Sequence, residues 1–161
     1  MHSQWRVIMP RCRQSDTYMT RIIQTQKIGT ERKRLVRAIV ISIRELSRQQ
    51  GQSAETKDLI AFIYACLAAI SKGIETTVAP WEKRDYWVKA DRFRMEWDWT
   101  GPTSQQLKEN LMADEWTKIP ELLAKIGGKF INEKVSEKHR MGQPWHGAWD
   151  RLLASSPNSK E

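Results

Sequence analysis

The residue types that could do chemistry in this chain are carboxylates, basic side chains and tryptophans. Residues 80–99 are rich in carboxylates, among them Asp85, Asp91, Glu96 and Asp98, and hold five Lys/Arg residues. Asp91 and Asp98 are seven residues apart, so on a helix they share one face, as two ligands of a metal pair would. The neighbouring basic residues make ion pairing the better interpretation of these acids, and we do not predict a two-metal site.

Nucleophilic and metal chemistry have little support elsewhere in the sequence. No metal-ligand spacing connects the histidines and cysteines, which are His2, His139, His146, Cys12 and Cys66. There is no glycine-rich phosphate loop, and no serine or cysteine lies in a local signature of nucleophilic catalysis. We therefore expect a protein that is not an enzyme, binds no metal or cofactor, and keeps two free thiols in a reducing compartment.

The excess positive charge is confined to the first third of the chain. Residues 1–50 hold 11 Lys/Arg against three acids, a balance of +8 that equals the net charge of all 161 residues. Residues 51–161 hold 16 of each kind. A one-sided basic excess is typical of a surface that binds a polyanion, most often a nucleic acid. The alternative is an ordinary soluble protein that happens to be basic.

Much of this charge falls on one predicted helix, from Thr30, a good N-cap, to about Gln50, with Gly51 as its stop. Its apolar stripe consists of Leu35, Val36, Ile39, Ile43 and Leu46. Away from that stripe, four bases with no acid among them fall within about 60° of one another: Lys33, Arg37, Arg44 and Arg48. Like charges at this spacing repel, so we expect the row to bind phosphates. A solvated face neutralised by acids elsewhere in the fold is the alternative.

Residues 80–99 are unusual because they hold four of the eight tryptophans. Pro80 suits a first helical position and Thr100-Gly101-Pro102 suits a stop, so we predict one helix of about five turns. One face is a core stripe of Tyr86, Ala90, Phe93 and Trp97. A nearly opposite apolar face is predicted to be a subunit contact, formed by Trp81, Val88, Met95 and Trp99. The flanking bases predicted as a secondary nucleic-acid contact are Lys89, Arg92 and Arg94.

The tryptophans have two competing interpretations. Exposed indoles beside basic residues could stack on unpaired bases, whereas buried ones belong to the core. We expect Trp97, Trp116 and Trp149 to pack in the core. For Trp81, Trp87 and Trp99 both interpretations stay open.

Helical periodicity and capping signals extend over most of the chain. A short helix is predicted from Asp16 to Gln26, and another from the Ser53 cap to Lys72, closed by Gly73 and followed by a linker. The apolar run Leu59–Ile70 should make this second helix the centre of the bundle. Thr103 and Gln106 form a predicted capping box.

The C-terminal part has further helix signals. Pro120 is predicted to start a helix that Gly127-Gly128 bends or breaks. Gln143-Pro144 should open the last helix, whose inner stripe is Trp145, Trp149 and Leu152. No segment alternates with period two, so we predict an all-α, single-domain bundle of about five to six helices. Its predicted parts are an irregular basic arm at residues 1–15, the helical bundle at 16–153 and a disordered tail at 154–161.

The N-terminus has no continuous apolar segment, so we predict no signal peptide. The longest apolar run has 12 residues, which is too short to span a bilayer. The expectation is therefore a cytoplasmic protein without membrane contact.

This sequence resembles the small subunit of CRISPR Cascade-type (class 1) effector complexes. Like those subunits, it is short, basic and predicted to be all-helical, without catalytic residues. The segment that gives the resemblance its particular look is KRDYWVKADRFRMEWDW. In some subtypes that subunit corresponds to the C-terminal helical domain of the large subunit. The resemblance covers about residues 15–153 and lies in the overall profile, so no binding residue is transferred from the family.

The resemblance implies a non-catalytic role in RNA-guided antiviral defence. Several copies would contact other effector subunits and one another, and would hold target or displaced DNA, with guide RNA as a further candidate partner. Guide pairing, not the protein, would supply sequence recognition.

Two other functions fit the same residues. One is a helical adaptor that docks on an acidic protein partner, and the other is a DNA-binding transcriptional regulator. A helix-turn-helix reader would need a polar, basic second helix, whereas the helix after Gly51 is the most apolar in the chain. The pattern therefore disfavours that form of regulator.

Overall fold

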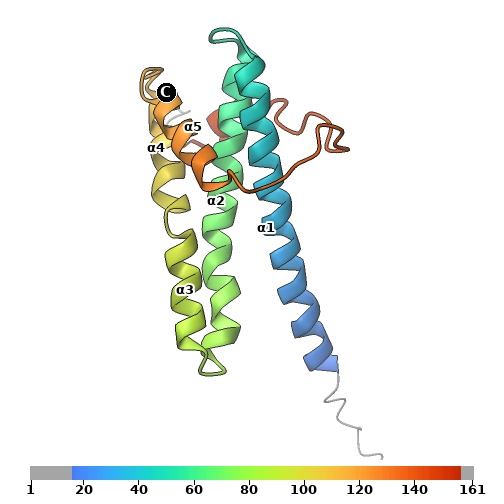
Figure 1. Cartoon of the computed structure of the whole chain (residues 1–161). Coiled ribbons are helices and arrows are strands. Elements are labelled where there is room, and N and C mark those ends of the chain that lie inside the picture. Colours follow the sequence, from blue (N-terminus) through green and yellow to red (C-terminus); the bar gives the residue numbers. More distant parts are fainter. Residues whose placement is uncertain (1–15, 157–161) are drawn as a thin grey trace, which may run out of the picture.

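Helices form the whole regular structure of the described part of the chain. The computed structural model describes residues 16–156, with side chains from residue 27 onward. Within this range there are helices and no strand, which confirms the predicted all-α bundle (Figure 1). The predicted arm at 1–15 and residues 157–161 of the predicted tail lie outside the described residues. The helices are α1 Asp16–Arg48, α2 Ala54–Glu82, α3 Trp87–Trp97, α4 Thr100–Met112, α5 Ile119–Lys129 and α6 Ala148–Ser155.

Helix α2 is the centre of the bundle, as its apolar run predicts. It packs against α1, α3, α4 and α6, and it fully buries Leu59, Ile63 and Leu67. Burying a leucine or isoleucine side chain stabilises a fold by about 1.5–3 kcal/mol, so these contacts are the main source of cohesion. The predicted Ser53 cap is confirmed, because its Oγ accepts from the backbone N–H of Thr56 at 3.1 Å.

Helix α2 also has the length and hydropathy of a membrane-crossing helix. The core helix of a soluble protein passes the same test, and α2 packs against four other helices of the bundle. Length and composition alone are weak evidence for a membrane span.

Two predicted helix ends are wrong, because α1 and α2 run through them. Helix α1 is continuous past Gly29 and Thr30, so Thr30 is not an N-cap. Helix α2 continues past Gly73 to Glu82, where a linker was expected. An internal glycine costs about 1 kcal/mol relative to alanine, which the buried residues on either side of Gly73 outweigh.

The predicted single helix at residues 80–99 is also wrong, because the chain reverses direction within it. Pro80 lies in the last turn of α2, where it removes little of the helix hydrogen bonding. Residues 83–86 form a turn in which the N–H groups of Arg84 and Tyr86 donate to the Trp81 carbonyl at 2.9 and 3.0 Å. Asp85 takes the left-handed conformation there, with φ 61°. Helices α2 and α3 consequently lie side by side as a hairpin (Figure 1).

The remaining helices depart from prediction mainly at their ends. Helix α4 starts at Thr100 instead of at the predicted capping box, and Pro102 is tolerated because first-turn N–H groups need no helix partner. A Cβ on Gly101 would meet Ser71 Oγ at 3.0 Å, so glycine permits close packing of α4 on α2. Pro120 at the start of α5 is confirmed, and Gly127-Gly128 does not interrupt that helix. Helix α6 begins at Ala148, after the predicted opening at Gln143-Pro144.

Candidate nucleic-acid interface

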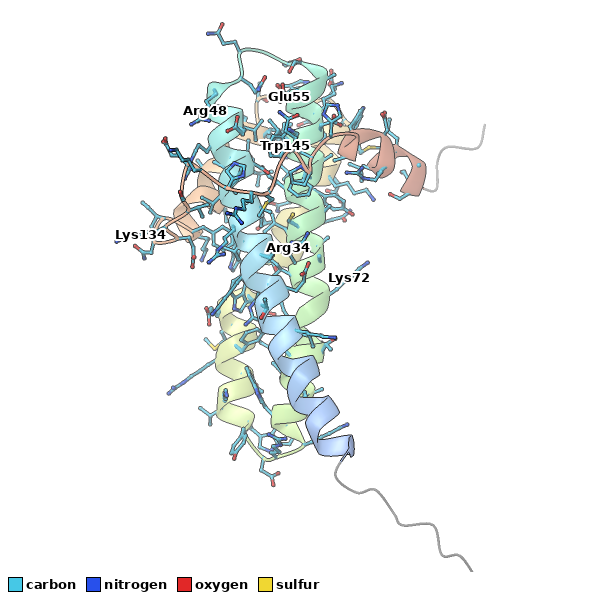
Figure 2. All side chains as sticks on the ribbon, turned by 90° about the vertical axis from the view of Figure 1, so that its right-hand side faces the viewer. Arg34, Arg48, Glu55, Lys72, Lys134 and Trp145 are labelled. Atoms are coloured by element: carbon cyan, nitrogen blue, oxygen red, sulfur yellow. The ribbon has the colours of Figure 1, made fainter. Side chains whose placement is uncertain are left out.

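Residues 131–147, here called the strap, connect α5 to α6 without regular helix and cross over α1 (Figures 1 and 2). The strap is anchored by Trp145, which is 3% exposed and packs with Ile41 of α1 and Leu59 of α2. Val135 and Met141 pack against the same cluster. Ile41 lies outside the apolar stripe of α1 and is buried because the strap covers it.

Polar contacts fix the strap at two further points. Arg44 of α1 donates from Nη2 to the carbonyl of Val135 at 2.9 Å. Near the end of the strap, the carboxylate of Asp58 on α2 accepts from the backbone N–H groups of Gly147 at 3.1 Å and Trp149 at 2.9 Å. Asp58 therefore supplies, from another helix, the capping that α6 lacks from its own N-cap residue.

Replacing Asp58 by alanine is expected to lower the free energy of unfolding by about 1–2 kcal/mol, as the loss of a helix cap does. The strap should loosen first, because both lost hydrogen bonds lie at its junction with α6. Urea unfolding measures the stability loss, and amide exchange of residues 147–150 locates it. Asp58→Asn keeps one acceptor oxygen and should lose less; equal losses for the two variants would contradict this role.

The strap and α1 enclose a groove of about 630 Å³ whose charged walls are all basic. Arg34 and Arg37 come from α1, and the strap adds three further cations and a histidine. We call this set the basic groove: Arg34, Arg37, Lys134, Lys138, His139 and Arg140. Figure 2 shows α1 from the side that the strap crosses, with Arg34 and Lys134 labelled. No carboxylate lines the groove among the described residues.

The cations of the basic groove are largely free to bind an anion. Among residues 27–156, Arg34 forms an ion pair only with Glu31, at 3.4 Å, and both side chains are more than half exposed. Such an exposed pair contributes about 0–1 kcal/mol, so a phosphate can displace it. The strap's own acids, Glu133 and Glu137, are exposed and lie outside the groove lining. Guanidinium groups bind phosphate in a bidentate manner, and ammonium groups act as point charges.

The predicted basic row on α1 does not act as one surface. Arg37 lines the basic groove, whereas Lys33 is exposed and does not belong to the groove lining. Arg44 donates its hydrogen bond to the strap, at the Val135 carbonyl. Arg48 forms an ion pair at 2.7 Å with Glu45, which lies outside the stripe of the four bases.

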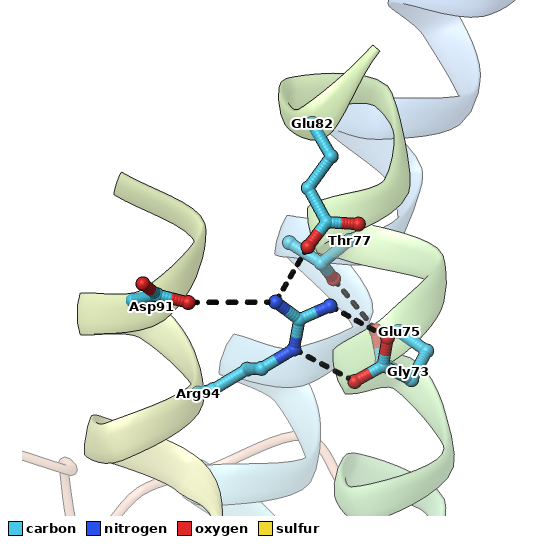
Figure 3. Close-up of polar contacts among 6 residues, drawn as sticks. All are labelled: Gly73, Glu75, Thr77, Glu82, Asp91 and Arg94. Carbon is cyan, nitrogen blue, oxygen red and sulfur yellow. Dashed lines mark hydrogen bonds and ion pairs between the residues drawn. The ribbon is translucent and has the colours of Figure 1, made fainter. Parts of the chain in front are cut away.

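Arg94, predicted as a secondary nucleic-acid contact, instead holds α3 against α2 (Figure 3). Its Nε and Nη2 donate to the two carboxylate oxygens of Glu75 at 3.0 and 2.9 Å, and its Nη1 donates to Glu82 at 2.6 Å. Asp91 lies 3.7 Å away. The hydrogen bond that Glu75 accepts from Arg94 lowers the pKa of Glu75, and the hydrogen bonds that Arg94 donates to Glu75 and Glu82 raise the pKa of Arg94.

This network predicts acid sensitivity of the hairpin. Because the pKa of Glu75 is lower in the folded chain than its ordinary value, its bridge to Arg94 is fully present above the ordinary glutamate pKa. The bridge is lost as the pH falls through the lowered pKa. Thermal melting at decreasing pH should show this loss in the wild type, whereas Arg94→Gln should be less stable at neutral pH and lack that component. Identical pH profiles for both proteins would contradict it.

The other predicted contacts on the hairpin divide between packed and exposed positions. The Lys89 ammonium lies 4.2 Å from the Trp81 ring centroid, and Arg92 is exposed. In the predicted subunit contact, Val88 and Met95 are 68% and 80% exposed. Its two tryptophans pack instead: Trp81 lies edge-on to Phe93 at 5.4 Å, and Trp99 lies 5.6 Å from Phe130. The four residues therefore do not form one continuous apolar face.

The aromatic core is partly as predicted. Trp97, Trp116 and Trp149 pack against the main apolar cluster, which confirms those three positions. Tyr86, predicted to be in the core stripe, is 55% exposed because the chain turns just before it. Arg32 connects α1 to α3, with its guanidinium 4.6 Å from the Phe93 ring centroid, and burial lowers its pKa.

Groups suited to covalent or metal chemistry are sparse in the described residues. Cys66 is buried, and burial raises its pKa to about 12, so the thiol stays protonated and unreactive. Among residues 16–156, no cluster of three or more His, Cys, Asp or Glu side chains could hold a metal ion. Cys12 and His2 lie outside the described residues.

Sequence reasoning found only Arg37 among the six residues of the basic groove. Lys134, Lys138 and Arg140 lie about 100 residues after α1 in a segment without helical period, so no pattern connects them to Arg34 and Arg37. The only local signal was their closeness in the sequence EKVSEKHR.

In comparisons with known proteins, no family model matches this sequence, and neither a curated protein nor a solved structure matches it. The class that the structure defines is an all-α helical bundle whose strap and α1 form a basic groove. Functional conclusions rest on that geometry and on the sequence.

Proposed function

We propose that this protein is a non-catalytic subunit that binds the sugar-phosphate backbone of a nucleic acid through the basic groove, without reading sequence. The main support for this proposal is that five Lys/Arg side chains and a histidine from two distant segments line one groove with no acid among them. Backbone binding needs such a row of cations, because each phosphate contact releases condensed counterions. Base-specific reading would need a helix or strand ribbon placed in a groove of the duplex, for which an irregular strap is unsuited.

The resemblance in sequence profile supplies the biological setting of this proposal. We propose that the chain serves as a small subunit of a CRISPR Cascade-type effector complex in the cytoplasm, with other effector subunits and further copies of itself as partners. Its basic groove would hold target or displaced DNA while guide pairing supplies specificity. Support for this setting comes from the size, charge and helical content of the chain.

The test is equilibrium binding of the isolated full chain to two labelled duplexes of unrelated sequence, followed by fluorescence anisotropy. We expect equal dissociation constants for the two duplexes. A preference for one duplex of more than about tenfold would favour a transcriptional regulator, whose specific sites bind far more tightly than others. Absence of binding at low salt would contradict the proposal and favour a protein-only adaptor.

The setting in a CRISPR complex has its own test. Co-expression with the other genes of the same operon, followed by affinity purification, should recover this chain in a complex that contains a guide RNA. Recovery of the chain without RNA or protein partners would contradict that setting and leave backbone binding to be judged by the anisotropy result.

A further inference from the structure

A second cleft lies at the tip of the α2–α3 hairpin, on α3 and the turn before it. It has a volume of about 800 Å³ and is lined by four aromatic rings together with Lys89 and Arg92. Trp87, the first residue of α3, is 55% exposed, and so is Tyr86 before it. Large aromatic side chains are usually buried, so two adjacent exposed rings in a cleft indicate a candidate binding site.

Trp87 differs from Trp81, Phe93 and Trp97 because no ring or cation among residues 27–156 lies against it, and its side chain is 55% exposed. The ammonium of Lys89 lies over the ring of Trp81, and the Trp81 ring packs edge-on against Phe93. Phe93 and Trp97 are covered by the guanidinium of Arg32 at 4.6 and 5.4 Å. The exposed part of the Trp87 indole is therefore available for stacking.

The charges around the cleft suit an uncharged planar group attached to an anionic backbone. Its lining holds two bases, Lys89 and Arg92, and two acids, Asp85 and Glu96, so the interior is electrically balanced. Lys83 and Arg84 are both exposed on the adjoining turn. A base could therefore enter the cleft while the phosphates beside it lie near the basic residues of the turn.

We infer that this cleft is a stacking site for an unpaired nucleobase, with Trp87 as the platform, and that it makes the protein bind single strands in addition to duplexes. The inference rests on the proposed function and deepens it, because it names the form of nucleic acid that the chain takes. Stacking is independent of sequence, since every base has a flat face. The basic groove holds backbone in either form, whereas the cleft accepts only a base that is free of pairing.

A peptide or a membrane surface is a less suitable occupant. A peptide side chain carrying a positive charge would meet Lys89 and Arg92, and one carrying a negative charge would meet Asp85 and Glu96. Insertion into a membrane interface would place those same two acids against anionic headgroups. An uncharged ring avoids all of these repulsions.

The test compares Trp87→Ala with the wild type in binding to an oligothymidine strand and to a duplex of the same length. Removing a stacking aromatic weakens binding by about 1–3 kcal/mol per base, which corresponds to an affinity for the single strand that is weaker by about 5- to 140-fold. Duplex affinity should change by less than twofold. Trp87→Phe, which keeps a flat ring, should restore most of the single-strand affinity.

Three outcomes would overturn the inference. The first is equal loss of single-strand and duplex affinity in Trp87→Ala, and the second is unchanged single-strand affinity. The third is Trp87-dependent binding to vesicles of anionic lipid, which would identify a membrane surface as the occupant. The proposed function fails separately, because it requires only that wild-type and Trp87→Ala proteins bind the duplex.

Discussion

Replacing Lys134, Lys138 and Arg140 together by glutamate is expected to abolish binding to unrelated duplexes at physiological salt. Each phosphate contact contributes about 0.9 to the slope of log affinity against log salt, and loss of three contacts weakens binding by at least about a hundredfold. The slope itself should fall by about two to three. All three side chains are exposed on the strap, so the fold should be unaffected. Anisotropy titrations over a range of salt concentrations measure both quantities.

A matched control separates the basic groove from net charge. Lys72, Lys118 and Lys125 are exposed and lie outside the groove, so their replacement by glutamate changes the charge equally. We expect this control to weaken binding by less than about tenfold, because distant surface charges are screened by salt. Equal losses in the two triple variants would show that overall charge, and not the groove, governs binding.

The second large effect is expected from Trp145, the apolar anchor of the strap. Trp145→Ala should lower the free energy of unfolding by about 3–5 kcal/mol, the range for truncation of a buried aromatic side chain. It should also weaken nucleic-acid binding, because the strap would no longer hold Lys134 and Lys138 beside α1. Urea unfolding measures the first effect, and anisotropy under conditions where the variant is folded measures the second.

Trp145→Phe is the informative partner of that variant. The Nε1–H of Trp145 is buried without an acceptor among the described residues, and such a group costs about 1–3 kcal/mol. Phenylalanine removes this cost while it keeps most of the apolar contact, so we expect a loss below about 1.5 kcal/mol and nearly normal binding. A phenylalanine variant as unstable as the alanine variant would show that apolar packing is not what holds the strap.

The core of the fold was predictable because it depends on strong local signals. The apolar run Leu59–Ile70 identified the central helix, Ser53 identified its start, and Pro120 identified the start of α5. The helix end at Gly73 was wrong because a glycine weakens a helix by about 1 kcal/mol, whereas tertiary packing of the long apolar helix α2 contributes more. The helix start at Pro80 was wrong because the chain turns at residues 83–86.

The candidate site was predictable only in part, because it joins segments that are distant in the sequence. Arg37 was found from its place on α1, but a helical wheel could not show that Arg44 bonds to the strap or that Arg94 bonds to α2. A variant that reverses the charge of the whole predicted row would therefore disturb the strap as well as remove cations. Variants confined to the strap lysines and Arg140 avoid that ambiguity.

The most direct test of the basic groove is differential modification of lysines in the free and DNA-bound protein. Acetylation read by mass spectrometry should show that Lys134 and Lys138 lose most of their reactivity when duplex is bound. Lys72 and Lys118, which are exposed outside the groove, should react equally in both states. Unchanged reactivity of Lys134 and Lys138 in the bound protein would contradict the assignment of this groove as the nucleic-acid interface.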